Sequence, residues 1–330
     1  MADCNVIKRI GIIGRGAIGV NLAYHLQNMQ STQNVQGMQN VQGIQNVQSI
    51  QNAENIETEL LIRDHYDPSQ PLTIHTENGE TQTLKCKQCF INENTLSKLD
   101  LIVIPVKHYQ LESVMKTIAP ILPNHTSVML LHNGMGGIEL AEKYLPNNLL
   151  LAATTTDGVY KTSANSFVQT AIGQLEMGFA NTDEAHLIAP DLNIDYVKKL
   201  HPNFHWREDI VFALYQKLAV NAVINPLTAL KNCKNGELEN YPEEVKKVKD
   251  EVFDLYEFMN LPIDNHALSA HIDNVIQLTK LNYSSMHQDF HHGRETEVEG
   301  ILGFLLQKGE ETGMKMDFIR QLYTQISTAK

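Results

Sequence analysis

Short apolar runs bounded by polar or turn-forming residues recur between residues 9 and 178. Residues 99–106, LDLIVIPV, form a nearly continuous apolar run, which is typical of a strand buried on both faces of a parallel sheet. The Asn78-Gly79 pair inside residues 72–90 predicts a hairpin turn between short strands. The pattern as a whole predicts strands at residues 9–13, 58–62, 72–90, 99–106, 127–131, 149–156 and 167–178.

The pattern changes after about residue 208, where apolar residues recur at helical spacing. Helices are predicted at residues 210–230, 243–259, 265–279 and 295–312. The fold class is therefore predicted to be α/β, with a doubly wound sheet in residues 1–207 followed by an all-helical domain in residues 208–330.

A glycine-rich turn follows the first predicted strand and precedes a helix-like segment at residues 20–27. The turn has the form G-x-G-x-x-G, in which the first glycine allows a tight turn, the second lets a pyrophosphate approach the backbone, and the third allows close helix–strand packing. This context favours a Rossmann-type nucleotide domain over a glycine turn in an unrelated α/β unit. The candidate cofactor-binding residues are Gly14, Arg15, Gly16, Ala17, Ile18 and Gly19.

The second predicted strand ends in Arg63-Asp64. An arginine at this position accommodates the 2′-phosphate of NADP, whereas an acidic residue binds the ribose hydroxyls of NAD. Arg63 comes first and favours NADP(H), although Asp64 keeps NAD open and Arg63 could be only a solvated strand end.

Residues 34–51 contain a hexad repeated three times, NVQGMQ, NVQGIQ and NVQSIQ. Apolar residues every third position fit neither a helix nor a strand well, and Gln/Asn-rich segments of low complexity are usually flexible. We therefore expect residues 28–55 to be an insertion that projects from the nucleotide domain and carries no chemistry.

A polar line runs along the first long helix of the second half. Lys217, Asn221 and Asn225 are spaced four apart among apolar residues, so they share one helix face. Asparagine is a poor helix former, which favours a cleft lined by donors and acceptors over a solvated surface stripe with a kink at Pro226.

Two further polar residues follow predicted strands directly. Lys107 follows the strand at 99–106, and Asn133 follows the strand at 127–131. Ligands bind beyond the carboxyl ends of strands in doubly wound sheets, so both residues are site candidates. The alternatives are an ordinary surface lysine and a turn asparagine before Gly134.

The formal charge of −12 argues against a nucleic-acid or membrane partner, because both attract basic patches. The N-terminus enters a strand without a signal-peptide pattern, so a cytoplasmic location is expected. The four cysteines are scattered and form no disulfide framework, and no ligand spacing indicates a metal.

Several segments together resemble the ketopantoate reductase (2-dehydropantoate 2-reductase) family, in order and approximate spacing over nearly the whole chain outside residues 28–55. They are GRGAIG at 14–19, PVKHYQ at 105–110, HNGMG at 132–136, KLAVNAVINPLTAL at 217–230, NGEL at 235–238, SSMHQD at 284–289 and ETE at 295–297.

The resemblance implies an NADPH-dependent enzyme that reduces ketopantoate to pantoate, a step toward pantothenate and coenzyme A. It implies Lys217 as the catalytic lysine, with Glu297 orienting substrate or lysine, and it places Lys107, Asn133, Glu297 and a backbone contact of Val159 near the cofactor. The substrate-binding positions that it implies are Asn133, Asn221, Asn225, Asn235, Asn282 and Ser285. Arg15 and Asp157 depart from the family pattern and could alter cofactor affinity.

Two other hypotheses remain open. The same fold could reduce another small 2-keto acid, or it could bind a nicotinamide nucleotide without catalysis. The expected partner is a small 2-keto acid, and the chain is expected to be a monomer or a homodimer.

Overall fold

A computed structural model describes residues 7–39, 56–180 and 197–329 of the chain. These residues form two compact units. The first unit comprises residues 1–106, 110–132 and 138–210, and the second comprises residues 107–109, 133–137 and 211–330. The expected boundary at 207/208 is therefore shifted by a few residues, and two short segments that we assigned to the nucleotide domain pack with the helical unit instead.

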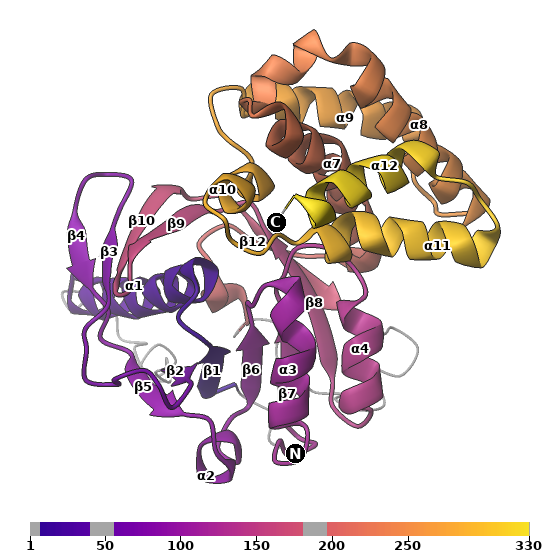
Figure 1. Cartoon of the computed structure of the whole chain (residues 1–330). Coiled ribbons are helices and arrows are strands. Elements are labelled where there is room, and N and C mark those ends of the chain that lie inside the picture. Colours follow the sequence, from indigo (N-terminus) through magenta and orange to yellow (C-terminus); the bar gives the residue numbers. More distant parts are fainter. Residues whose placement is uncertain (1–6, 40–55, 181–196, 330) are drawn as a thin grey trace. The chain divides into compact units, whose positions relative to one another are not determined.

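The first unit is built on a mainly parallel sheet of eight strands among the described residues, in the order β12-β11-β8-β7-β6-β1-β2-β5 (Figure 1). Its core from β5 to β8 is entirely parallel and has the Rossmann strand order, while β11 pairs antiparallel with β8. The strands are β1 (Arg9–Ile13), β2 (Glu57–Ile62), β5 (Lys87–Phe90), β6 (Leu101–Ile104), β7 (Ser127–Leu130), β8 (Leu150–Thr155), β11 (Leu175–Phe179) and β12 (Phe204–Trp206).

Alternate residues of the parallel strands pack on opposite faces of this sheet, because successive side chains in a strand point to opposite sides. Ile12 packs with Val20 and Leu26 of α1 (Ala17–Gln39) on one face. Ile13 on the other face belongs to the cluster that contains Leu111. The helices of that second face are α2 (Glu93–Leu96), α3 (His108–Ile118) and α4 (Gly137–Tyr144).

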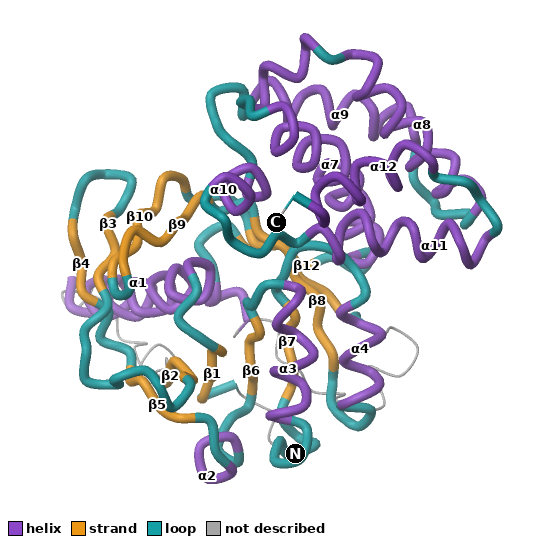
Figure 2. Tube along the Cα trace, in the orientation of Figure 1, coloured by secondary structure: helices purple, strands orange, loops and turns teal. Residues whose placement is uncertain are grey.

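A smaller sheet in the same unit has the order β4-β3-β10-β9, and Figure 2 shows its strands beside α1. It comprises β3 (Thr73–His75), β4 (Thr81–Thr83), β9 (Gly158–Ser163) and β10 (Ser166–Ala171). The predicted turn is present, with Gly79 at φ 82°. A short 3₁₀ turn, η2 (Lys198–Leu200), precedes β12.

Helix α1 corrects the prediction for the Gln/Asn-rich segment. The helix continues to Gln39 and so includes the first hexad of the expected insertion at 28–55. Propagating a helix that is already nucleated costs little, and polar residues such as Gln allow it. Residues 40–55 lie outside the described part of the chain.

The second unit is helical, and Figure 1 shows its main helices packed as a bundle. It contains α7 (Ile210–Lys231), η3 (Asn235–Asn240), α8 (Pro242–Phe258), α9 (Asn265–Leu278), α10 (Ser285–His291), the π-helical turn η4 (Glu299–Gly303), α11 (Phe304–Thr312) and α12 (Asp317–Thr328). Helix α7 supplies the centre of the apolar core through residues such as Leu218, Ala222 and Val223.

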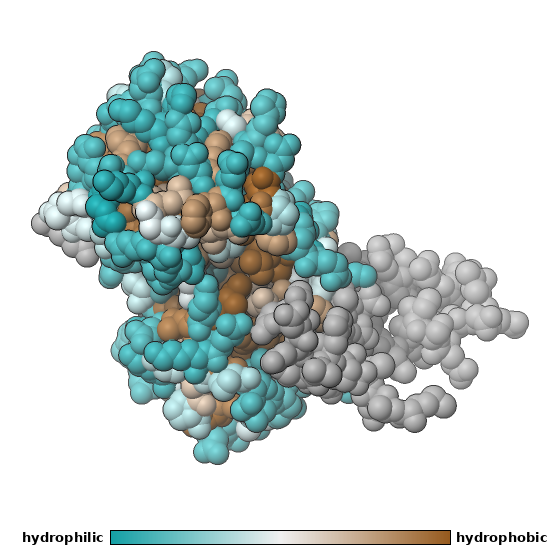
Figure 3. Space-filling model, turned by 90° about the vertical axis from the view of Figure 1, so that its right-hand side faces the viewer, coloured by the Kyte–Doolittle hydropathy of each residue, from teal (hydrophilic) through white to brown (hydrophobic). Residues whose placement is uncertain are grey.

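Helix α7 is also long and apolar enough to cross a membrane by length and composition alone, but 61% of its most apolar window is buried in the structure. This burial is typical of a core helix. The face of the helical unit that Figure 3 shows is mainly hydrophilic, with apolar residues interspersed.

The helix predicted at 295–312 was placed too early. Residues 295–297 are not helical, and the regular helix begins after them, so Glu297 lies in the segment that enters the helix rather than on a helix face. The sequence analysis also missed several short or amphipathic elements, namely α2, α3, α4, β9, β12, α10 and α12.

Candidate active site

The glycine-rich loop joins β1 to α1 in the first unit. Gly14 has φ 85°, a conformation that favours glycine, and its N–H donates to the carbonyl of Leu61 at 2.8 Å. A Cβ atom on Gly19 would lie 3.0 Å from Pro105 Cγ and 3.1 Å from Ile12 Cγ2. The loop therefore has the tight turn and the close helix–strand packing that a dinucleotide site requires.

Two other cofactor candidates lie in the same unit. Arg63 is exposed directly after β2, and Val159 is half-buried on β9. Arg15, in the glycine loop, is buried and stacks over the ring of Tyr66, with its Cζ 5.1 Å from the ring centroid.

Lys107, Asn133 and Glu297 meet in the second unit although they are far apart in the sequence. The Glu297 side chain is only 5% exposed, and its Oε2 accepts from Lys107 Nζ at 3.0 Å and from Asn133 Nδ2 at 3.1 Å. Its Oε1 accepts from the backbone N–H of His108 at 3.2 Å. The carboxylate is thus held in one orientation by three donors.

Asp289 is the functional candidate that the sequence analysis missed. It is buried on α10, its Oδ2 accepts from Lys107 Nζ at 3.1 Å, and its Oδ1 accepts from Arg294 Nε at 2.9 Å. The only sequence signal was its place at the end of the SSMHQD segment. Its contact with Lys107 makes it a positioning residue for that amine.

The two carboxylates determine the charge state of Lys107. Burial would lower the pKa of its ammonium, but Glu297 and Asp289 outweigh burial and raise the pKa of Lys107 above its usual value. Lys107 therefore remains a cation near neutral pH, which makes it poorly suited to release a proton.

A close backbone contact fixes the Asn133 segment. Gly134 has φ 84°, and a Cβ atom on it would lie 2.4 Å from the carbonyl oxygen of Gly300 in η4. The N–H of Met135 donates to that same carbonyl at 2.8 Å. Glycine is required at position 134 both by its φ angle and by this contact.

Asn235, one of the predicted substrate-binding asparagines, is held near the start of α10 by two hydrogen bonds. Asn235 is buried, its Nδ2 donates to Thr279 Oγ1 at 2.9 Å, and its backbone N–H donates to the carbonyl of Asn282 at 2.9 Å. The Oδ1 atom of Asn235 is buried and has no hydrogen-bond partner within the part of the chain that the structure describes. An orphan acceptor of this kind is costly unless a ligand or water satisfies it.

Ser284 and Ser285 have different places at the N-terminus of α10. Ser284 is buried and caps the helix, since its Oγ accepts from the N–H of His287 at 3.1 Å and lies 2.7 Å from Thr228 Oγ1 of α7. Ser285 is exposed at the first helical position, where it can reach a ligand. Helix α10 thus links α7, through Ser284, to Lys107, through Asp289.

The three polar residues predicted to share a helix face all lie on α7. Lys217 and Asn221 are half-buried and Asn225 is buried, all three on a helix whose other side chains form the apolar core. Hydrogen bonds join Lys107 and Asn133 to Glu297 directly, whereas Lys217, Asn221 and Asn225 are related by their spacing on α7. All predicted catalytic and substrate-binding residues lie in the second unit.

Asp157 belongs to a buried polar cluster in the first unit. Its Oδ1 accepts from the N–H of Gly173 at 2.7 Å and lies 3.1 Å from His201 Nε2, and its Oδ2 accepts from Asn21 Nδ2 at 2.8 Å. Burial would raise the pKa of the Asp157 carboxyl, but the contacts with His201 and His25 outweigh burial and hold the pKa well below its usual value.

The ligand atoms of His25, Asp157 and His201 lie within 4.8 Å of one another, close enough to hold a metal ion. However, the N–H of Asn203 donates to His201 Nδ1 at 3.1 Å, so the neutral ring carries its proton on Nε2 and donates it to Asp157. A metal on Nε2 would require the proton on Nδ1, against the Asn203 N–H. The geometry therefore favours a hydrogen-bonded network.

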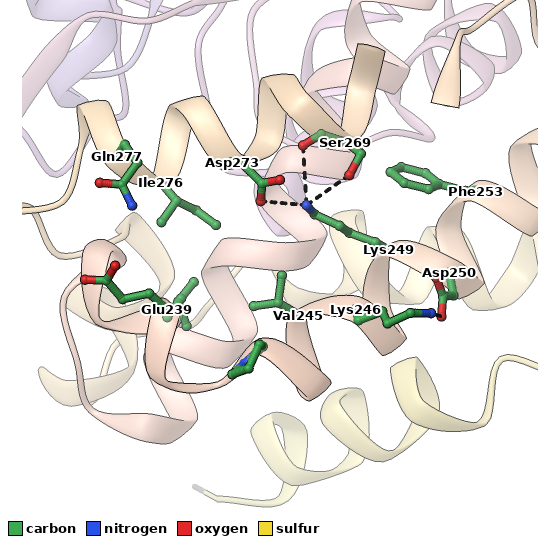
Figure 4. A pocket seen from close by; sticks show the side chains of 12 residues that line it. Glu239, Val245, Lys246, Lys249, Asp250, Phe253, Ser269, Asp273, Ile276 and Gln277 are labelled. Carbon is green, nitrogen blue, oxygen red and sulfur yellow. Dashed lines mark hydrogen bonds and ion pairs between the residues drawn. The ribbon is translucent and has the colours of Figure 1, made fainter. Parts of the chain in front are cut away.

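A pocket of about 500 Å³ opens elsewhere in the helical unit, between η3, α8 and α9 (Figure 4). None of the predicted site residues lines it. The buried amine of Lys249 in its wall binds Asp273 Oδ1 at 2.6 Å and both oxygens of Ser269 at 3.1 and 3.3 Å, which uses all three of its donors. The charge of Lys249 is thus already used within the pocket wall.

The comparisons with known proteins agree with this arrangement. Residues 10–182 match the family model described as "Ketopantoate reductase PanE/ApbA", and residues 209–330 match its C-terminal counterpart. The 2-dehydropantoate 2-reductase of Vibrio cholerae serotype O1 is 36% identical over 243 residues, which cover 72% of this chain and 81% of that protein. The 2-dehydropantoate 2-reductase of Bacillus subtilis is 31% identical over 241 residues, covering 72% and 78%.

Solved structures extend the likeness to almost the whole chain. A probable 2-dehydropantoate 2-reductase from Bacillus subtilis has a TM-score of 0.75 at 26% identity and covers 98% of this chain and 100% of its own. A D-mandelate dehydrogenase bound to NADH and anilino(oxo)acetate has a TM-score of 0.79 at 20% identity, covering 97% and 98%, which supports the fold alone. With both halves matched by family models, the chain belongs to the ketopantoate reductase family.

Proposed function

We propose that this chain is a 2-dehydropantoate 2-reductase, which reduces ketopantoate to pantoate for pantothenate biosynthesis. The observation that carries the proposal is the Lys107–Asn133–Glu297 network, because its three members come from motifs far apart in the sequence and meet in the unit that also carries Lys217. Family membership supports the same reaction.

The chain's residues account for the chemistry at the carbonyl group. A bound nicotinamide cofactor supplies the hydride. Negative charge then develops on the carbonyl oxygen, and the half-buried ammonium of Lys217 would stabilise that charge and donate the proton. Lys107 is held as a cation by two carboxylates, which favours Lys217 over Lys107 as the proton donor.

The remaining polar residues orient the substrate. Asn221, Asn225 and Asn235 offer donors and acceptors that can bind a hydroxyl group without adding charge. Ser285 at the start of α10 can donate to the substrate carboxylate. The orphan Oδ1 of Asn235 supports this role, because a substrate hydroxyl would satisfy it.

We further propose NADPH as the preferred cofactor. The glycine loop with Gly14 and Gly19 fits a dinucleotide, and the exposed Arg63 directly after β2 is placed to meet a 2′-phosphate. The proposal also includes a cytoplasmic location and a monomer or homodimer. The ketopantoate reductase of Staphylococcus aureus, whose structure has the same fold at 20% identity, is dimeric.

Turnover of the Lys217→Ala variant tests the proposal. We expect wild-type protein to oxidise NADPH with ketopantoate faster than with other small 2-keto acids. In Lys217→Ala we expect kcat to fall by about 10²–10⁴-fold, the usual contribution of a general acid, while NADPH binding stays nearly intact. Lys231→Ala is the matched control, since Lys231 ends the same helix and pairs with Glu244. Unchanged turnover in Lys217→Ala would exclude the proposed role.

A further inference from the structure

The glycine loop carries a buried arginine that is not matched by a carboxylate. Arg15 is 5% exposed, and its buried Nε has no hydrogen-bond partner among residues 7–39, 56–180 and 197–329. Its Nη2 donates to Asn165 Oδ1 at 2.5 Å, and its guanidinium stacks over Tyr66. These contacts fix the side chain, but neither of them is an ion pair with a carboxylate.

Within the described residues, no carboxylate oxygen lies within ion-pair distance of Arg15. Asp67 attracts it only at longer range, and the Oδ1 of that carboxylate accepts from the hydroxyl and N–H of Ser69 at 2.7 and 2.9 Å. Arginine is almost never buried without a partner, since an unpaired buried charge is costly. An anionic ligand would remove that cost.

A second cation lies near the same place. Lys161 on β9 has its Nζ 5.7 Å from the centroid of the Phe167 ring, and no carboxylate pairs with it among the described residues. Partial burial, and then the positive charge of Arg15, lower the pKa of Lys161. Two cations that repel each other, without an intervening acid, are typical of an anion site.

The backbone shows which phosphate this site would face. The hydrogen bond from Gly14 N–H to Leu61 places the loop beside the end of β2, where Arg63 follows, and Tyr66 under the Arg15 guanidinium is in the same β2–β3 connection. In this fold the ribose 2′ position lies at the end of β2, whereas the pyrophosphate lies at the helix N-terminus.

We propose that Arg15 and Lys161, together with Arg63, form the binding site for the 2′-phosphate of the cofactor. This inference rests on the proposed NADPH preference and adds two residues to it. Arg15 and Lys161 then determine the discrimination between NADPH and NADH, while the glycine backbone binds the part that both cofactors share.

Calorimetric titration with two nucleotide fragments tests the inference without turnover. Adenosine 2′,5′-bisphosphate and 5′-AMP differ only in the 2′-phosphate. In full-length Arg15→Gln and Lys161→Gln we expect the bisphosphate to bind about tenfold more weakly, as the loss of a charge-assisted hydrogen bond implies, with 5′-AMP affinity nearly unchanged. Lys98→Gln, an exposed lysine in the same unit, is the control.

Equal weakening of both fragments in the Arg15 and Lys161 variants would overturn the proposal, because it would place these cations at the shared 5′-phosphate. Unchanged binding of both fragments would overturn the proposal as well. The role of Arg15 would then be to hold the loop in place through its contacts with Asn165 and Tyr66. Lys161 is exposed, so Lys161→Gln tests the charge without risk to folding. If the fragments behave as expected but ketopantoate is not reduced, the substrate assignment fails and this site stands.

Discussion

The buried Asp157 cluster permits a sharp test by the substitution Asp157→Asn. The side chain of Asp157 is 5% exposed, and donors face both of its oxygens: Gly173 N–H and His201 Nε2 at one, Asn21 Nδ2 and His201 Nε2 at the other. An amide nitrogen in either position would point its hydrogens at donors. His201 cannot accept instead, because the N–H of Asn203 fixes its tautomer.

The magnitude follows from the hydrogen bonds that are lost. A hydrogen bond to a charged group contributes about 1.5–3 kcal/mol, and at least two are lost, while the neutral amide is easier to bury than the carboxylate. We expect Asp157→Asn to lower the free energy of unfolding of the first unit by about 3 kcal/mol at pH 7.

The pH dependence has a definite sign. The pKa of Asp157 is lower in the folded state than its ordinary value of 3.8, so the folded state favours the carboxylate. The stabilisation by Asp157 is fully present above that ordinary value and is lost as the pH falls below it. The difference between wild type and Asp157→Asn is therefore expected to shrink in acid.

Urea unfolding followed by tryptophan fluorescence measures this effect in the right unit. Trp206 is the only tryptophan, and it lies on β12 with its ring 4.9 Å from that of Phe179. The control is Asp64→Asn, which removes an exposed carboxylate of the same unit. If Asp157→Asn and Asp64→Asn unfold at the same urea concentration, the reasoning about the cluster is refuted.

Three further substitutions test the active site. Asp289→Asn removes one of the carboxylates that raise the pKa of Lys107, so we expect kcat/KM to fall about three- to tenfold and the alkaline limit of the pH–rate profile to move to lower pH. Asp289→Glu should recover part of both effects. An alkaline limit that does not move would count against a positioning role for Asp289. Ser284→Ala removes the cap of α10 and should cost about 1–2 kcal/mol in thermal unfolding, with a higher KM for the keto acid at similar kcat. Gly134→Ala would meet a backbone carbonyl and should lower stability by about 3 kcal/mol or more, whereas Gly79→Ala, at a similar φ in open space, should cost about 1 kcal/mol.

The central strands β6, β7 and β8 of the large sheet were readily predicted because they are buried on both faces. The run LDLIVIPV gave one such strand, observed as β6, and its flanking polar residue Lys107 was correctly placed after it. By contrast β9, with the exposed residues Tyr160 to Ser163, has little apolar signal, so sequence reasoning could not find it. Strands with buried side chains on both faces were therefore predictable from the sequence, whereas exposed strands were not.

The site was predicted in its residue types but not in its contacts. Periodicity located Lys217, Asn221 and Asn225 because one helix carries all three. The contacts of Glu297 with Lys107 span 190 positions, and those of Asp289 with Lys107 span 182, so no local pattern reports them. Family resemblance supplied Glu297, and Asp289 emerged only from the three-dimensional structure.

The division of the chain has a consequence for anyone who would engineer it by exchanging modules. The helical unit consists of three separate segments of the sequence, namely residues 107–109, 133–137 and 211–330. A fragment that starts at residue 211 would lack Lys107, Asn133 and the His108 N–H. The buried carboxylate of Glu297 would then lose these three hydrogen-bond donors. A functional chimaera must therefore transplant both short segments together with the C-terminal portion.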